Sequence, residues 1–152
     1  MTDTNRVKTV LFDIDGTLAN IEHRRTYLAP PKPNWGAFNG AMGHDTPNEP
    51  IVALYKTLWR TVDYAPILVT GRNEKFRQVT EQWLAWNEIP FDRLLMRADK
   101  DSRADHVIKE EILDRLLAEG LNIVFTVDDR QQVVDMWRRR GIVCLQCDVG
   151  DF

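Results

Sequence analysis

Short apolar runs of strand length alternate along the chain with segments whose apolar residues recur at helical spacing. The runs lie at 7–12, 67–70, 93–96, 122–127 and 142–146. Helical spacing or helix-terminus signals mark residues 50–60, 74–87, 103–119 and 130–140. This alternation predicts an α/β fold, a three-layer sandwich with a parallel or mostly parallel central sheet and helices on both faces.

One stretch, residues 19–49, breaks the rhythm. It is rich in Pro, Gly and Asn, with Arg24, Arg25, Tyr27, Trp35 and Phe38 interspersed. A loop of this length inside a domain is usually a functional lid or has structure of its own. We therefore expect one domain over residues 1–152 that carries a small cap-like insertion. Trp35 and Phe38 are expected to anchor the insertion to the core. Alternatively, a substrate's sugar, base or phosphate is contacted by Arg24, Arg25, Tyr27 or Trp35.

Composition and charge narrow the class of protein. The chain has 152 residues, 43% of them apolar and 28% charged, enough for one substantial core. A net charge of -3 disfavours a protein that coats duplex nucleic acid through a wide basic face, although a local site for a nucleic-acid end remains possible. MTDTNRVK has no signal-peptide core, and the apolar runs are too short to span a bilayer. We expect a cytoplasmic protein with no membrane partner.

The two cysteines, Cys144 and Cys147, form a C-x-x-C pattern within a late apolar run. A zinc site would need further ligands, and the three histidines are scattered without ligand spacing. Residues three apart in a strand face opposite sides. We interpret both as ordinary strand thiols, one in the core and one at the surface.

Polar residues gather where the predicted strands end. The first strand runs into Asp13 and Asp15, the second into Thr70-Gly71-Arg72, and the fourth into Asp128-Asp129-Arg130. In parallel sheets these carboxyl ends meet at one edge, where ligands bind. Unit charges about 4 Å apart repel by about 4 kcal/mol at an effective dielectric constant of 20, so clustered carboxylates need a compensating cation or altered protonation. A hard divalent ion, magnesium, is the cation that the sequence predicts here. An EF-hand calcium loop is excluded because Gly16 follows Asp13 too closely.

Lys109 adds the positive charge that phosphoryl transfer needs. It shares a helical stripe with four apolar residues, where packing alone would favour another apolar residue, although a lysine stem can also extend to water from such a position. A carboxylate can attack phosphorus while a second acid protonates the leaving oxygen. These residues favour phosphate-ester chemistry over helix capping, which is a credible alternative only for Asp129.

Four segments together resemble the motifs of the haloacid dehalogenase superfamily, which has a Rossmann-like fold: DIDGT at 13–17, Thr70 closing ILVT, Lys109, and VDD at 127–129. The resemblance implies that Asp13 is the nucleophile and Asp15 the general acid and base. It also implies that Thr70 and Lys109 bind the transferring phosphate. Magnesium would lie between Asp13, the backbone carbonyl of Asp15, and Asp128, with Asp129 supporting the site.

The segments TGRNE, SRADHVIKEEIL, VDDRQQVVDMWRRRGIVCLQ and the final GDF are similar to the phosphatase domain of phage polynucleotide kinase-phosphatase. This likeness implies that Arg72, beside Gly71, clamps the substrate phosphate, with Arg103 and Arg130 as lesser candidates. No G-x-x-x-x-G-K-[ST] occurs, so we expect no kinase domain in this chain.

The implied activity is magnesium-dependent removal of a terminal 3′-phosphate from a DNA or RNA end. Two alternatives stay open: a nucleotidase or general phosphatase that acts on small phosphomonoesters, and a phosphate-sensing module without catalysis. The oligomeric state is not predicted.

Overall fold

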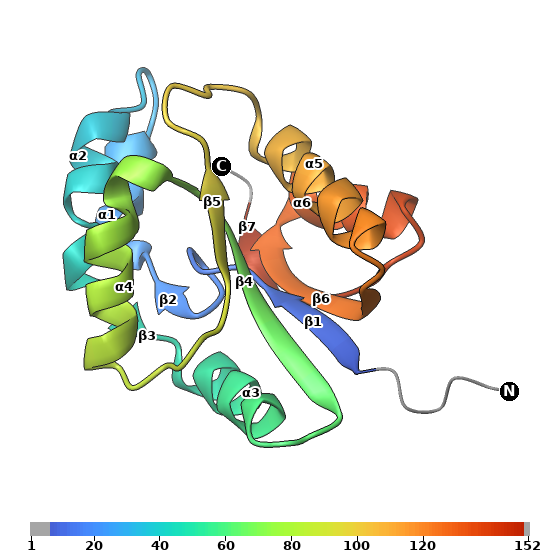
Figure 1. Cartoon of the computed structure of the whole chain (residues 1–152). Coiled ribbons are helices and arrows are strands. Elements are labelled where there is room, and N and C mark those ends of the chain that lie inside the picture. Colours follow the sequence, from blue (N-terminus) through green and yellow to red (C-terminus); the bar gives the residue numbers. More distant parts are fainter. Residues whose placement is uncertain (1–6, 151–152) are drawn as a thin grey trace, which may run out of the picture.

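A five-stranded parallel sheet forms the centre of the computed structural model, which describes residues 7–150 (Figure 1). The ends of the chain, including the last two residues of GDF, lie outside the described residues. The strand order is β5-β4-β1-β6-β7, and every neighbouring pair is parallel, which confirms the predicted α/β fold. The strands are β1 (Lys8–Phe12), β4 (Tyr64–Asn73), β5 (Leu94–Arg97), β6 (Asn122–Arg130) and β7 (Val143–Gly150).

Helices cover both faces of the sheet and create two apolar cores. On one face lie α3 (Glu49–Trp59) and α4 (Arg77–Trp86), and on the other α5 (Asp105–Ala118) and α6 (Gln131–Arg139) (Figure 1). A 3-10 turn, η3 (Glu74–Phe76), precedes α4 and accounts for the earlier predicted start of that helix. The two-residue period of β1 divides its side chains between the cores: Val10 and Phe12 enter the first, and Leu11 enters the second.

Two strands extend further than the apolar runs that predicted them. β4 continues through Thr70-Gly71-Arg72, and β6 continues through Asp128-Asp129-Arg130. After a shift of register, Asn73 pairs with Arg97 of β5, and Arg130 pairs with Gly150 of β7. The polar motifs therefore lie within the last residues of strands that still have a neighbour, rather than in loops beyond them.

The insertion has secondary structure of its own, one of the two outcomes expected for it. Its base is closed by an antiparallel pair in which Ala19 pairs with Pro47 and Asn20 with Thr46. Phe38 is buried and anchors the insertion, whereas Trp35 remains 47% exposed. The elements are β2 (Ala19–Asn20), α1 (Glu22–Arg25), η1 (Thr26–Leu28), α2 (Trp35–Gly40), η2 (Met42–His44) and β3 (Thr46–Pro47).

The cysteines behave as ordinary strand residues. Both are free thiols in β7; Cys144 belongs to the core under α5 and α6, and Cys147 packs against the opposite core. Burial raises the pKa of the Cys147 thiol to about 12, so it stays protonated at neutral pH. Nothing in residues 7–150 forms a helix long and apolar enough to cross a membrane.

Candidate active site

The register of the sheet brings three predicted site residues together. Phe12 at the end of β1 pairs with Leu68 of β4 and Val127 of β6. Asp13 and Asp128 are the next residues on adjacent strands, so their carboxylates meet at the carboxyl edge of the sheet, as predicted. Thr70 follows on the other side of β1; it is fully buried, and its hydroxyl accepts a hydrogen bond from the backbone N–H of Arg72 at 3.1 Å.

Asp13, Asp128 and Asp129 form a buried acidic cluster. Each offers a carboxylate oxygen within 4.8 Å of the others, and each side chain is nearly inaccessible to water. Burial, followed by the charge of Asp128, raises the pKa of Asp13 well above its ordinary value and that of Asp129 to about 6. The cluster therefore holds more negative charge than its surroundings favour.

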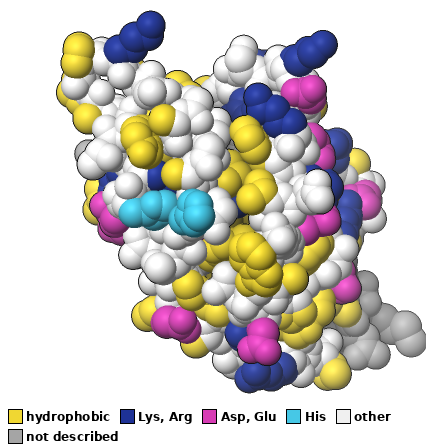
Figure 2. Space-filling view, turned by 90° about the vertical axis from the view of Figure 1, so that its left-hand side faces the viewer, with side chains coloured by type: hydrophobic (Ala, Val, Ile, Leu, Met, Phe, Trp, Pro, Cys, Tyr) yellow, Lys and Arg dark blue, Asp and Glu magenta, His cyan; other side chains and the backbone are white. Residues whose placement is uncertain are grey.

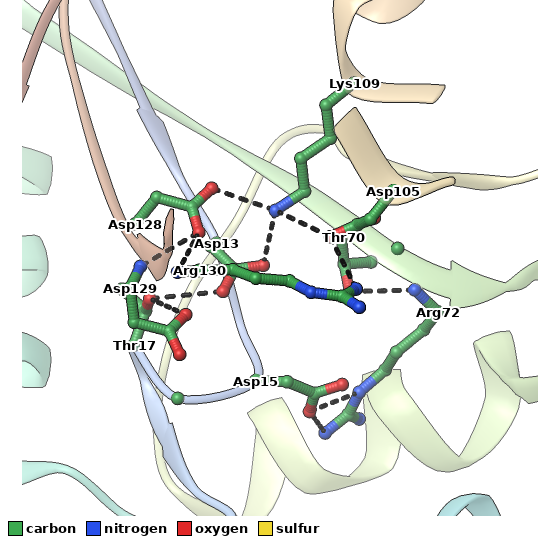
Figure 3. A network of polar contacts seen from close by, with 12 residues as sticks. Asp13, Asp15, Thr17, Thr70, Arg72, Asp105, Lys109, Asp128, Asp129 and Arg130 are labelled. Carbon is green, nitrogen blue, oxygen red and sulfur yellow. Dashed lines mark hydrogen bonds and ion pairs between the residues drawn. The ribbon is translucent and has the colours of Figure 1, made fainter. Parts of the chain in front are cut away.

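Lys109 enters this cluster from α5. Its ammonium donates to Oδ1 of Asp13 at 2.8 Å and to Oδ2 of Asp128 at 2.9 Å, and it is 1% exposed (Figure 3). Burial alone would lower the pKa of Lys109, but the charges of Asp128 and Asp13 raise it well above its ordinary value. Lys109, the polar residue on an apolar helical stripe, is thus a buried cation that faces the acidic cluster. The alternative, in which its side chain extends to water, is wrong.

Asp15 lies apart from the cluster, on the side of Arg72 (Figure 3). The first strand does not stay extended through Asp15: β1 ends at Phe12, and the chain turns at Gly16, whose φ is +79°. Side chains at Gly16 are excluded because a Cβ would lie 2.1 Å from Oδ2 of Asp129. The turn still leaves the carboxylates of Asp13 and Asp15 in the same pocket.

Two arginines hold the Asp15 carboxylate. Arg72 donates to Oδ1 through Nε at 3.0 Å and Nη2 at 2.6 Å, and Arg24 donates to the same oxygen at 2.6 Å. Burial alone would raise the pKa of Asp15, but the charges and hydrogen bonds of Arg72 and Arg24 lower it to about 2. The carboxylate predicted to be the general acid and base is therefore strongly held in its ionised form.

Asp45 of the insertion completes this second network, and sequence reasoning missed it. Its carboxylate accepts two hydrogen bonds from Arg24, at 2.7 Å each, and one from Arg72 at 3.1 Å. Its backbone carbonyl accepts from the indole N–H of Trp83 in α4. The expectation that Arg24 contacts substrate is wrong: its guanidinium is 0% exposed and bound to carboxylates, and unlike Arg72 it does not line the cavity above Asp13 and Asp15. No local sequence motif marks Asp45. The signal that it has a role is the burial of Arg24, which is visible only in the structure.

A cavity of about 480 Å³ opens over both networks. Gly71 lies on its wall, and a Cβ there would lie 2.0 Å from Oδ1 of Asp105, so a larger residue would displace the Asp105 carboxylate. Asp105 is a second missed residue; its spacing of four from Lys109 on α5 was the available signal, and Oδ2 lies 3.8 Å from that ammonium.

Arg103 also lines the cavity but pairs with Asp101 and Glu111. Arg130 lies 3.7 Å from Asp105.

The donor set fits a hard divalent cation. Three carboxylates converge, and oxygen ligands of this charge are those that Mg²⁺ prefers. Burial first, and then repulsion from Asp128, raises the pKa of Asp13 and of Asp129, and a bound cation would relieve that repulsion. The Asp15 carboxylate is not a member of this set because it is bound to arginines, which leaves its backbone carbonyl as the contribution that the resemblance implies.

Known proteins are similar to this chain over most of its length. Residues 7–152 match the family described as "Polynucleotide kinase PNKP phosphatase domain". The solved "Pnkp1/Rnl/Hen1 RNA repair complex" aligns with a TM-score of 0.83 and 36% identity, over 99% of this chain and 45% of that chain. A protein of Autographa californica nuclear polyhedrosis virus, described as a bifunctional polynucleotide kinase/RNA ligase, is 26% identical over 86% of this chain and 18% of its own length.

A more distant structure shares only the fold. It is a HAD family enzyme of Bacteroides thetaiotaomicron, solved in complex with magnesium and inorganic phosphate, at 16% identity and a TM-score of 0.50 over 96% of both chains. Our chain thus spans less than half of the RNA repair relative and under a fifth of the viral one. From the match over residues 7–152, the chain belongs to the phosphatase domain family of polynucleotide kinase-phosphatase, and it is a phosphatase of the haloacid dehalogenase superfamily.

Proposed function

We propose that this phosphatase removes the terminal 3′-phosphate from a polynucleotide end, in a magnesium-dependent reaction that passes through an aspartyl-phosphate on Asp13. The observation that carries the proposal is the Asp13 carboxylate itself. It faces a cavity of about 480 Å³, and Lys109 and the hydroxyl of Thr17 hold it on opposite oxygens at 2.8 and 3.1 Å. A carboxylate held in place by a lysine ammonium and a hydroxyl is suited to in-line attack on phosphorus.

In the first step, an Asp13 oxygen forms a bond to phosphorus while the bond from phosphorus to the 3′-oxygen breaks. Asp15 gives its proton to that oxygen, which leaves as a 3′-hydroxyl. Asp15 must therefore gain a proton after substrate binds. Arg72 supplies the means: a substrate phosphate that takes its guanidinium weakens the ion pair that keeps the pKa of Asp15 at about 2.

In the second step, water attacks phosphorus of the aspartyl-phosphate and the bond to the Asp13 oxygen breaks. Asp15, now a carboxylate, accepts the proton of that water, and inorganic phosphate leaves. Lys109 and Arg72, with Thr70 as a hydrogen-bond donor, stabilise the charge on the phosphoryl oxygens in both steps. A magnesium ion held by Asp13, Asp128 and the Asp15 carbonyl, with Asp129 in support, would add positive charge at the same oxygens.

Two kinds of support favour a polynucleotide end over a free nucleotide. The relatives that span most of this chain are named for polynucleotide kinase, RNA ligase and RNA repair activities. In addition, the cavity is lined by the insertion, by η3 and by the loop after β5, and the space-filling view shows a notch between two raised parts of the surface (Figure 2), which leaves room for a polymer end to approach. The product, a 3′-hydroxyl, is the end that a ligase joins, so we propose an RNA end as the first substrate to test.

The test compares matched oligonucleotides that differ only in the position of one phosphate. Release of inorganic phosphate is measured from RNA and DNA strands with a 3′-phosphate, from the same strands with a 5′-phosphate, and from nucleoside 3′-monophosphates. Asp13→Asn, of nearly equal size, controls for contaminating phosphatases. We expect turnover of 3′-phosphorylated strands by the native protein, little turnover of 5′-phosphorylated ones, and none by the variant.

Three outcomes count against the proposal. Turnover of the mononucleotides alone would assign a nucleotidase. Equal turnover of 3′- and 5′-phosphates would assign a general phosphatase. An unchanged rate in Asp13→Asn would remove Asp13 as nucleophile, and binding of phosphate without any turnover would favour a sensing module.

A further inference from the structure

The outer wall of the cavity differs in chemistry from its floor. The floor is acidic and holds the networks of Asp13 and Asp15. The rim includes aromatic side chains from two separate segments, Trp35 and Phe38 of the insertion and Phe76 of η3, with Lys75 beside the last. Nothing in the phosphoryl-transfer chemistry above requires these four residues. Their position beside the scissile group makes them available to the part of the substrate that leaves.

The side of the cavity on which the leaving nucleoside lies follows from Asp15. The group that protonates the 3′-oxygen must lie within hydrogen-bond reach of it, so the leaving nucleoside is on the Asp15 side. Asp15 is held by Arg24 at 2.6 Å, and the guanidinium of Arg24 lies 4.3 Å from the centre of the Phe38 ring. Phe38 in turn contacts Trp35 edge to face, with ring centres 5.6 Å apart. A continuous chain of contacts thus leads from the proposed acid to Trp35.

Trp35 is more exposed than a structural tryptophan needs to be. Its contact with Phe38 covers part of the ring, yet 47% of the residue remains accessible, whereas Trp83 and Trp137 are each 1% exposed. Because Phe38 is buried and fixed under Arg24, the exposed ring sits on a rigid support. A rigid, half-exposed aromatic ring at the rim of a phosphate site is suited to stacking on a nucleobase.

Lys75 differs from the other basic residues that line the cavity. Arg72, Arg97, Arg103 and Arg130 each have a carboxylate within 4.0 Å. Lys75 is exposed, and among residues 7–150 its ammonium has no carboxylate within that distance; it lies 5.1 Å from the centre of the Phe76 ring. An ammonium in this state is available to an incoming anion such as a backbone phosphate of the strand.

The geometry points to a leaving-nucleotide subsite in which Trp35 stacks on the base of the nucleotide that bears the 3′-phosphate, and Lys75 binds the phosphodiester on the 5′ side of that nucleotide. This inference rests on the proposed function and specifies its substrate as a single-stranded end of at least two nucleotides. The cavity volume agrees with one nucleotide, since pockets for such ligands hold roughly 300–1,000 Å³. Base–aromatic stacking tolerates any base, so the subsite reads the presence of a base rather than its identity.

The experiment measures KM and kcat on 3′-phosphorylated monomer, dimer and trimer, and on a trimer whose last nucleotide is abasic. Trp35→Ala should raise KM for the monomer, dimer and trimer alike by about 5- to 150-fold, the range of one lost base–aromatic stack, with kcat changed much less. Trp35→Phe should restore most of the loss. On the abasic end the native protein also lacks the stack, so native protein and Trp35→Ala should share one KM. Trp86→Ala, an exposed tryptophan of α4 outside the cavity lining, is the matched control.

Lys75→Met tests the second contact independently. It should raise KM for the dimer and trimer but not for the monomer, which has no phosphodiester. It should also reduce the slope of log KM against log salt concentration by about 0.7, the value for one phosphate contact with a single strand. Failure to hydrolyse any 3′-phosphorylated strand would overturn the proposed function. Hydrolysis with equal KM values for the native protein, Trp35→Ala and Lys75→Met would leave that function in place and overturn the subsite.

Discussion

The ammonium of Lys109 donates a 2.8 Å hydrogen bond to Oδ1 of Asp13, although the two residues are 96 positions apart in the chain. Both side chains are almost fully buried, and the same ammonium also neutralises Asp128. The contact ties α5 to the end of β1. The contact therefore joins the proposed phosphate-binding ammonium of Lys109 and the proposed nucleophile Asp13 in one buried ion pair. Loss of this ion pair should affect both folding and catalysis.

Lys109→Met should abolish turnover and lower the free energy of unfolding. The substitution leaves two buried carboxylates without their cation, and breaking a buried pair in this way costs about 3–5 kcal/mol. Urea unfolding in chelator at neutral pH measures the loss. Lys8→Met, which removes an exposed lysine of β1, should change stability little. A Lys109→Met protein as stable as the native one would contradict the buried ion pairs.

Asp129→Asn should stabilise the metal-free protein while it reduces activity. The pKa of Asp129 is raised to about 6, so between about pH 4 and 6 the folded state binds a proton that the unfolded chain has released. The unfolding free energy contributed by this group therefore falls as pH rises through that window and stays low above it. We expect Asp129→Asn to gain on the order of 1–3 kcal/mol at pH 7.5 in chelator and nothing below pH 4. Asp135→Asn on α6 is the exposed control.

Chelation should abolish turnover, and added magnesium should restore it. Magnesium should also raise the melting temperature, because a ligand that binds only the folded state stabilises it. The increase should be larger at pH 7.5 than at pH 5, because protons compete for Asp13 and Asp129, whose pKa values are raised. Differential scanning calorimetry at both pH values measures this. Full activity in chelator, or a larger increase at pH 5, would rule out the proposed metal site.

Arg24→Lys should lower kcat by about 10- to 100-fold, an effect typical of displaced catalytic groups. An ammonium cannot reproduce the planar fork with which Arg24 spans Asp15 and Asp45. With one of its two cations weakened, Asp15 should titrate above its native pKa of about 2, which carboxyl-carbon NMR can follow. Arg25→Lys, in a surface pair with Glu22, serves as the control. An unchanged titration of Asp15 would show that Arg24 does not position it.

The sequence allowed the fold and the acidic cluster to be predicted because both depend on local patterns. Alternating strand and helix signals fix the parallel sheet, and a parallel sheet places Asp13 beside Asp128 without knowledge of any side-chain contact. Lys109 could be predicted for a similar reason, since a charge on an apolar helical stripe faces the sheet. In these cases backbone periodicity decides where a side chain points.

The second network could not be predicted, because it depends on an irregular segment. Arg24 and Asp45 meet 21 residues apart inside the insertion, where no periodicity specifies direction. Asp15 likewise lies in the turn after β1, which ends at Phe12, so the two-residue period of the strand does not specify that its side chain points toward Arg72. The lengths of β4 and β6 were underestimated because their polar last residues still form backbone pairs with the edge strands β5 and β7. Backbone pairing does not require apolar side chains, so the apolar runs did not reveal it.

Arg24 and Phe38 secure the insertion from beneath, yet the stretch between them, residues 29–34, is exposed along its whole length. Chemistry and selectivity are therefore separable in this molecule. Grafting a different tip between those two anchors offers a route to new end preferences that leaves the hydrolytic machinery undisturbed.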